Sequence, residues 1–155
     1  EILIGLVGSE MCIRDSKGPS EDEVNWINGV LRQYSSRDAI IITHSYLKKS
    51  ASYTTQGKAI FEKIVKANPN VFLVLCGHCR DISYKNVQLD DDGDGDPDRT
   101  VYAILSNFQG SKAGGGGYMR ILDFRDSDIY IYTYSPYYDS CEYPKGKTEA
   151  TVPLP

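Results

Sequence analysis

The chain has 155 residues, of which 41% are hydrophobic and 25% are charged. This length and apolar content suffice for one globular domain with a hydrophobic core. The formal net charge of −4 argues against a nucleic-acid partner, because such partners are usually bound by a basic surface. No apolar run approaches the roughly 20 residues that a membrane-spanning helix needs, so no membrane span is expected. The four cysteines are too few and too unevenly spaced for a disulfide framework or a pair of zinc knuckles.

The first sixteen residues contain a stretch, GLVGSEMCIRDS, that resembles the translation of a sequencing adapter. We therefore predict that residues 1–16 are a non-native segment, which is excluded from functional reasoning like an expression scar. The alternative interpretation is a genuine strand, ILIGLV, followed by a loop. If the segment is non-native, the authentic chain starts near Lys17 and lacks an upstream part.

The next elements in chain order are an amphipathic helix and a short buried strand. Ser20 is a candidate N-cap, and Glu23 three residues later completes a capping box. Apolar residues then recur at helical spacing, which predicts a helix over residues 20–34. The apolar run AIIIT predicts a strand over residues 39–43, directly before His44.

A second helix and a second strand follow. Residues 57–67 carry an apolar stripe at helical spacing, and Asn68-Pro69 ends it. The continuous apolar run VFLVLC, residues 71–76, is typical of a strand buried on both faces. Strand, helix and strand at this spacing predict a crossover unit with two parallel strands. The carboxyl ends of such strands share the sheet edge where ligands bind in open α/β sheets.

After Arg80 the pattern changes to alternating strands separated by turns. Residues 90–98 form an Asp/Gly turn and residues 114–117 a glycine loop. Residues 138–155 show no period and are expected to be an extended tail or linker. The predicted fold class is therefore α/β (α+β), with a parallel βαβ unit followed by an antiparallel β meander. The strands of the meander are predicted over residues 82–89, 100–105, 118–124 and 129–134.

The stretch LCGHCR, residues 75–80, supports two chemistries. As Cys-x-x-Cys, CGHC matches the active-site tetrapeptide of disulfide isomerases, which predicts a thiol-disulfide oxidoreductase. Such an enzyme uses a helix directly after the motif to lower the pKa of the first thiol. Here the residues after Cys79 alternate like a strand. In the simplest alternative, Cys76 and Cys79 serve as small apolar residues at a strand end.

The metal interpretation of the same stretch rests on the two histidines of the chain, His44 and His78. Each lies just past the carboxyl end of a predicted buried strand. If those strands are neighbours, the two imidazoles converge on one sheet edge, where neutral nitrogen ligands bind Zn, Fe or Mn ions. A lone histidine is usually an ordinary surface or core residue, but two in equivalent positions favour a metal site.

Five stretches in this order, IIITHSYL, NPNVFLVLCGHCR, RTVYAILSNFQ, GGGGYMRILDF and IYIYTYSP, together resemble the C-terminal half of a calcineurin-like metallophosphoesterase. The resemblance covers residues 17–137. It implies an αββα sandwich and a metal-dependent phosphoester hydrolase that acts on a small phosphoester with two divalent ions of Zn, Fe or Mn. It also implies that His44 and His78 are ligands of one ion. Tyr46, Asn107 and the glycine loop are expected near that edge and are candidates for lining a pocket, although a core or turn role is favoured for each.

Two departures from the family pattern follow from the same resemblance. The second histidine of the Gly-His-x-His motif falls where this chain has Arg80, which is either a phosphate contact or a surface residue. The upstream Asp-x-His, Gly-Asp and Gly-Asn-His motifs are absent from this chain. We therefore expect a truncated phosphoesterase that does not assemble a two-metal site alone.

The acidic stretch DDDGDGDPD, residues 90–98, fits the pattern D-x-D-G-D-G-x-x-D. Spaced carboxylates with a glycine at the sharp turn suit Ca²⁺, although Val101 stands where an EF-hand has its closing Glu. The same composition is typical of a solvated hairpin turn. A second function is thus a noncatalytic, calcium-stabilised, β-rich binding module, in which the two histidines are unrelated in space. Its candidate ligands are Asp90, Asp92, Asp94 and Asp98.

Overall fold

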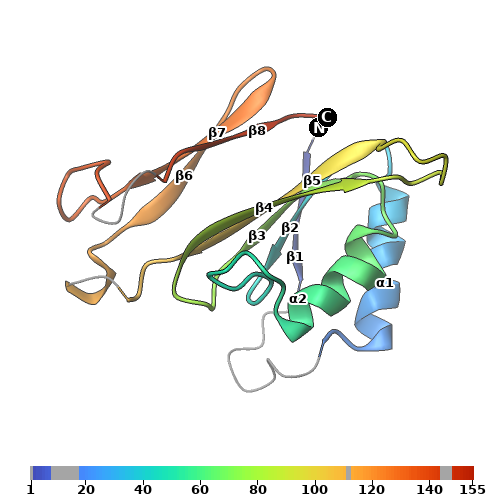
Figure 1. Cartoon of the computed structure of the whole chain (residues 1–155), viewed down its shortest axis with the longest axis horizontal. Coiled ribbons are helices and arrows are strands. Elements are labelled where there is room, and N and C mark those ends of the chain that lie inside the picture. Colours follow the sequence, from blue (N-terminus) through green and yellow to red (C-terminus); the bar gives the residue numbers. More distant parts are fainter. Residues whose placement is uncertain (1, 8–17, 111–112, 144–147) are drawn as a thin grey trace.

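The computed structural model describes residues 2–7, 18–110, 113–143 and 148–155, and these form three layers. Helices α1 and α2 cover one face of a five-stranded sheet, and a separate three-stranded sheet lies on the other side (Figure 1). The five-stranded sheet mixes parallel and antiparallel pairs. The chain is therefore an α+β protein, which confirms the predicted fold class.

The five-stranded sheet places the carboxyl ends of its parallel strands at one edge. Its order is β1-β2-β3-β5-β4, with β1, β2, β3 and β5 parallel and β4 antiparallel to β5. The hairpin of β4 and β5 thus returns to extend the parallel sheet next to β3. The strands are β1 (Ile2–Val7), β2 (Asp38–Thr43), β3 (Val71–Cys76), β4 (Asp81–Leu89) and β5 (Arg99–Asn107).

The first strand lies within the segment that was predicted to be non-native. β1 pairs in parallel with β2 from Ile2↔Asp38 to Val7↔Thr43. This pairing agrees with the alternative interpretation of these residues as a strand. Residues 8–16 lie outside the part of the chain that the structure describes. The non-native origin of residues 1–16 stays a prediction, because strand pairing concerns only the backbone of residues 2–7.

Helix α1 (Glu21–Gln33) begins as the sequence predicts. The backbone N–H of Glu23 donates to Ser20 Oγ across 3.3 Å, and the Ser20 N–H donates to the Glu23 carboxylate across 2.7 Å. This reciprocal pair is a complete capping box, so two of the helix's otherwise unpaired N–H groups are satisfied. Ile27 and Leu31 are buried against the sheet.

Helix α2 (Thr55–Ile60) starts two residues earlier than predicted and continues into a π-helical turn (Phe61–Val65). The earlier start has a local cause, because Thr54 Oγ1 accepts a hydrogen bond from the N–H of Gly57 across 2.9 Å. Threonine is a good N-cap residue, and this cap fixes the first helical position. A continuous helical stripe in the sequence does not distinguish the α-helical part from the π-helical part.

Alternating residues of the central strands build two hydrophobic cores. In β2, Ala39 and Ile41 face the helices and Ile40 faces the second sheet. This alternation is the ordinary consequence of a pleated strand buried on both faces. In β3 a register shift opposite Ala39 and Ile40 interrupts the alternation. Phe72 and Leu73 therefore both face the second sheet. The core between the two sheets consists of Ile40, Phe72, Leu73, Ile104, Ile129, Ile131 and Val152.

The second sheet contains β6 (Met119–Phe124), β7 (Asp128–Tyr134) and β8 (Ala150–Pro153), in that order. The antiparallel pair of β6 and β7 agrees with the sequence prediction. The expectation of an extended tail after residue 137 is corrected, because β8 pairs with β7 and Val152 is buried between the sheets. A strand of four residues that includes a proline is too short to show a period in the sequence.

Among the residues that the structure describes, no helix is long and apolar enough to cross a membrane.

Candidate metal centre

The two histidines meet at the carboxyl edge of the five-stranded sheet. His44 directly follows β2, His78 follows β3 by two residues, and the Gly77 N–H donates to the His44 carbonyl across 3.1 Å. The Nε2 of His44 lies 2.9 Å from the Nδ1 of His78, and the ring centroids are 4.8 Å apart. The predicted convergence of the two imidazoles is therefore confirmed.

The backbone of His78 is held in an unusual conformation. Its φ is +58°, in the left-handed region that only a few per cent of non-glycine residues adopt. The side-chain amide of Asn107, at the end of β5, donates to the His78 carbonyl across 2.9 Å. The Asn107 Oδ1 in turn accepts from the Gln109 N–H across 2.9 Å. The Asn107 side chain thus holds the loop after β3, which carries His78, through the backbone carbonyl of His78.

Two buried hydroxyl groups lie beside this edge. Thr43 Oγ1, next to His44, and Ser106 Oγ, next to Asn107, are buried and make no hydrogen bond with any described residue. Most buried polar groups in proteins have a partner, and an unpaired one calls for an explanation such as a water molecule or an ion. The two hydroxyl groups at this edge therefore lack a hydrogen-bond partner among the described residues.

The two imidazoles fit part of the ligand set of one ion. Zinc binds imidazole nitrogen at about 2.0–2.1 Å, so one ion can contact two nitrogens that are separated by 2.9 Å. Within the described part of the chain, the one group of three His, Cys, Asp or Glu residues close enough to share an ion is elsewhere, in the acidic loop. The described residues thus offer two ligands for one ion and do not fit a second ion at this edge.

The other residues proposed for this edge have different surroundings. Arg80 is exposed, and its side chain crosses Gly110, where an added Cβ would lie 3.2 Å from Arg80 Cδ. Tyr46 is 1% exposed and belongs to the core on the helix side, with its ring 5.3 Å from that of Tyr53. Tyr46 therefore has the core role that was favoured over the pocket role, because its ring is enclosed by core residues.

The cysteines of the CGHC motif lack the surroundings of a redox dithiol. Burial raises the pKa of the Cys76 thiol to about 11, which is opposite to the lowering that a catalytic thiolate requires. The strand β4 begins two residues after Cys79, so no helix follows the motif. Cys76 instead packs as an apolar residue in the helix-side core. This geometry argues against the oxidoreductase interpretation.

The acidic loop gathers three of its four proposed ligands. Carboxylate oxygens of Asp90, Asp92 and Asp98 lie within 4.8 Å of one another, and all three residues are exposed. The carboxylate of Asp94 accepts instead from the Asp96 N–H across 2.8 Å. Hydrogen bonds from the Gly93 and Gly95 N–H groups lower the pKa of the Asp90 carboxyl. The loop is thus a compact turn organised by carboxylates.

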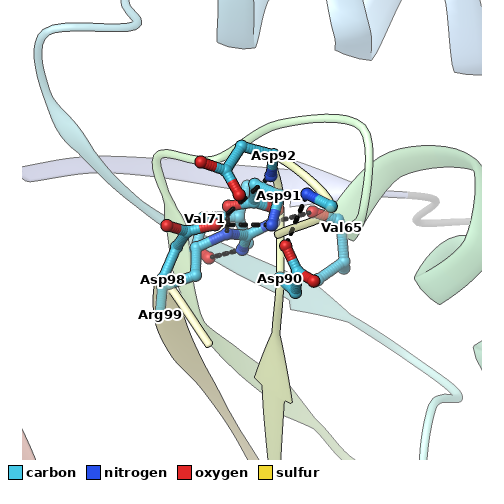
Figure 2. Close-up of polar contacts among 8 residues, drawn as sticks. Val65, Val71, Asp90, Asp91, Asp92, Asp98 and Arg99 are labelled. Carbon is cyan, nitrogen blue, oxygen red and sulfur yellow. Dashed lines mark hydrogen bonds and ion pairs between the residues drawn. The ribbon is translucent and has the colours of Figure 1, made fainter. Parts of the chain in front are cut away.

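Arg99 anchors this loop to the opposite end of the sheet from the histidines. Its guanidinium donates to the carbonyls of Val65 and Val71 and binds the Asp91 carboxylate (Figure 2). The register pairs Leu89 with Arg99 at one end of the hairpin and Asp81 with Asn107 at the other. The nine residues of β5 span roughly 26 Å at about 3.3 Å per residue. The acidic loop is therefore too distant to supply ligands to the histidine edge.

No protein-family model matches this chain. Among curated proteins, the chain is similar to the uncharacterized protein YvnB of Bacillus subtilis (strain 168), with 43% identity over 122 residues. The match covers 77% of this chain and 10% of YvnB, so the chain spans about a tenth of the length of that relative.

Sequence reasoning missed a group of lysines along the loop after β2 and along α2 with its π-helical turn. The segment from residue 48 to residue 66 contains five lysines, although the net charge of the chain is −4. The whole-chain charge concealed this local concentration, because most of the acidic excess lies in other segments such as residues 90–98. Three of these lysines, Lys48, Lys58 and Lys63, line one groove.

Proposed function

We propose that this chain supplies the C-terminal part of a calcineurin-like metallophosphoesterase site, in an enzyme that hydrolyses phosphoesters with divalent metal ions. The observation that carries the proposal is the 2.9 Å separation of His44 Nε2 and His78 Nδ1 at the carboxyl edge of adjacent parallel strands. The layers of helices, sheet and sheet also agree with three layers of an αββα sandwich.

In this proposal, His44 and His78 hold one transition-metal ion of the Zn, Fe or Mn group through neutral nitrogens. Asn107 fixes the His78 loop, which keeps the second imidazole in place. A bound ion supplies Lewis-acid activation of a phosphoryl group and of water. Any further ligands, including all those of a second ion, are provided by residues other than the described ones. Arg80 stands on the same edge as a candidate donor to a phosphate oxygen.

A metal titration of the metal-stripped chain tests this proposal. Calorimetry with Zn²⁺ and Mn²⁺ is expected to give one site per chain, lost in His44→Ala and in His78→Ala and retained in the control Asp92→Ala. Co²⁺ absorption spectra provide a second readout of nitrogen ligation. Binding that is unaffected by both histidine variants would overturn the proposal. Binding of two ions together with hydrolysis of an aryl phosphate would instead contradict the expectation that this chain alone has an incomplete site.

The acidic loop supports a second candidate function, a noncatalytic binding module stabilised by calcium. The favouring observation is the approach of the Asp90, Asp92 and Asp98 carboxylates to within 4.8 Å, since Ca²⁺ prefers several oxygen ligands from one loop. Calorimetry with Ca²⁺ tests it, with Asp92→Ala as the variant and the exposed Asp126→Ala as the control. An unchanged calcium isotherm in Asp92→Ala would dispose of this candidate.

A further inference from the structure

A groove of about 450 Å³ lies between the loop that follows β2 and the surface of α2 and its π-helical turn. One wall is the loop that follows β2, with Lys48, Tyr53 and Thr54. The other wall is the surface of α2 and the π-helical turn, with Lys58 and Lys63. The groove therefore combines a concave shape with cationic side chains from two different elements.

The positive charge of this groove is not neutralised locally. No described residue forms an ion pair with Lys48, Lys58 or Lys63, and all three are exposed. The one acidic residue that lines the groove, Glu62, has its carboxylate bound by Lys66 across 3.0 Å. A further cation, the Lys85 ammonium, lies 5.1 Å from the ring centroid of Tyr53. The groove is thus a cationic surface on a chain of net negative charge.

The loop that carries Lys48 is fixed by hydrogen bonds. Leu47 and Tyr53 form an antiparallel bridge, and the Lys48 N–H donates to the Ser52 carbonyl across 2.8 Å. The hydroxyl of Ser83, on β4, donates to the Lys48 carbonyl across 2.9 Å. Because the backbone is held from two sides, the wall of the groove is largely formed before any ligand binds. Such preorganisation lowers the entropic cost of binding.

One wall of the groove contacts the segment that follows His44. Thr54 lines the groove, and its Oγ1 accepts a hydrogen bond across 3.1 Å from the hydroxyl of Ser45, the residue after His44. The acidic loop is at the other end of the sheet, where Arg99 holds it. The aspartates of residues 90–98 and the lysines of the loop after β2 therefore lie at different ends of the sheet, and the nearer carboxylate, Asp81, is paired with Lys49 across 2.7 Å. The local excess of cations at the groove attracts an anionic ligand.

We propose that this groove binds a second anionic group of the substrate, so that the substrates are small phosphoesters with at least one further phosphate group. This inference rests on the proposed phosphoesterase function. The reacting phosphate occupies the histidine edge, and the additional phosphate extends into the groove between Lys48, Lys58 and Lys63. Lysine is suited to this task as a point charge with three rotatable donors. The groove thereby selects polyanionic phosphoesters over simple monoesters.

Binding of tripolyphosphate to the metal-free chain tests the groove independently of catalysis. Calorimetry is expected to show that tripolyphosphate binds more tightly than inorganic phosphate and weakens as salt is added. The variant Lys58→Gln/Lys63→Gln should weaken tripolyphosphate binding about tenfold, because two partly screened charge contacts are removed. The control Arg32→Gln/Arg125→Gln removes the same formal charge from two exposed sites away from the groove, of which Arg125 is paired with Asp123.

Two results would overturn the groove proposal. One is tripolyphosphate affinity in Lys58→Gln/Lys63→Gln equal to that of the control variant. The other is binding that leaves the NMR resonances of the His44 ring unchanged, since the second phosphate then does not reach from the groove to that edge. Neither measurement needs a metal. Failure of the phosphoesterase proposal is instead read from the metal titration of the histidine variants, so the two failures are distinguishable.

Discussion

The side-chain amide of Asn107 donates a hydrogen bond to the backbone carbonyl of His78 across 2.9 Å, which joins the end of β5 to the loop after β3. Partners that orient a metal ligand typically change metal affinity by 10–100-fold when they are removed. We expect Asn107→Ala to lower the affinity for Zn²⁺ about tenfold and to reduce the free energy of unfolding by about 1 kcal/mol. Calorimetry and urea denaturation measure the two effects.

The control for this prediction is Gln109→Ala. Gln109 contacts Asn107 through its backbone N–H, so loss of its exposed side chain should leave both quantities nearly unchanged. Equal metal affinity in Asn107→Ala and the wild-type chain would show that Asn107 does not position His78.

The left-handed backbone of His78 predicts an inverted ranking of two substitutions. Alanine normally stabilises a protein relative to glycine, because glycine loses more conformational entropy on folding. At a φ of +58° the Cβ of a non-glycine residue is unfavourable by roughly 1 kcal/mol. We therefore expect His78→Gly to be more stable to urea than His78→Ala by about 1 kcal/mol, although both lose the imidazole. The opposite ranking would mean that this loop does not hold the left-handed conformation in solution.

The sequence was sufficient to place the histidine pair. Each histidine follows an apolar run long enough for one buried strand, and the helix between the runs requires a parallel crossover, so the two strand ends had to share an edge. The capping box of Ser20 and Glu23 was equally local and is confirmed. These features depend on spacing within short segments, which is what a single sequence records most directly.

Other features depend on contacts that the sequence does not record. The burial of Tyr46 follows from the close approach of α2, and a tyrosine after a strand has no pattern that separates a core role from a pocket role. The strand β8 is too short to show a period, and it forms because β7 offers a free edge and the sheet interface accepts Val152. The lysine groove combines residues of two elements, and its charge is hidden in a net value of −4.

The contact between α2 and the loop after β2 predicts that Gly57 tolerates no side chain. A Cβ added at Gly57 would lie 2.0 Å from the carbonyl oxygen of Tyr46. We expect Gly57→Ala to lower the free energy of unfolding by about 3 kcal/mol, because backbone atoms must move apart. The control is Gly29→Ala on α1, where nothing lies within 4 Å of the added Cβ, and it should stabilise by about 0.5–1 kcal/mol. A neutral Gly57→Ala in thermal or urea unfolding would contradict the close approach.

The hydrogen bonds to Asp90 predict a pH-dependent contribution to stability. The Gly95 and Gly93 N–H groups lower the pKa of the Asp90 carboxyl in the folded state below its ordinary value of 3.8. A lowered folded-state pKa gives stability that is present above the unfolded pKa and is lost as the pH falls through the folded pKa. The difference in unfolding free energy between the wild-type chain and Asp90→Ala should therefore be constant at neutral pH and diminish below about pH 4. Asp126→Ala serves as the exposed control.

The burial of Cys76 predicts that this cysteine of the CGHC motif is inert in thiol chemistry. With a pKa of about 11, the Cys76 thiol is ionised to only about one part in a thousand near pH 8, and the thiolate is the reactive form. We expect iodoacetamide to modify the exposed Cys141 before Cys76 and, near neutral pH, to modify Cys76 only after unfolding in urea, as mass spectrometry of the digested chain can show. The rate at Cys76 should rise as the pH approaches 11, because the thiolate fraction increases. Rapid modification of Cys76 near neutral pH, or catalysis of insulin reduction by the chain, would restore the oxidoreductase interpretation.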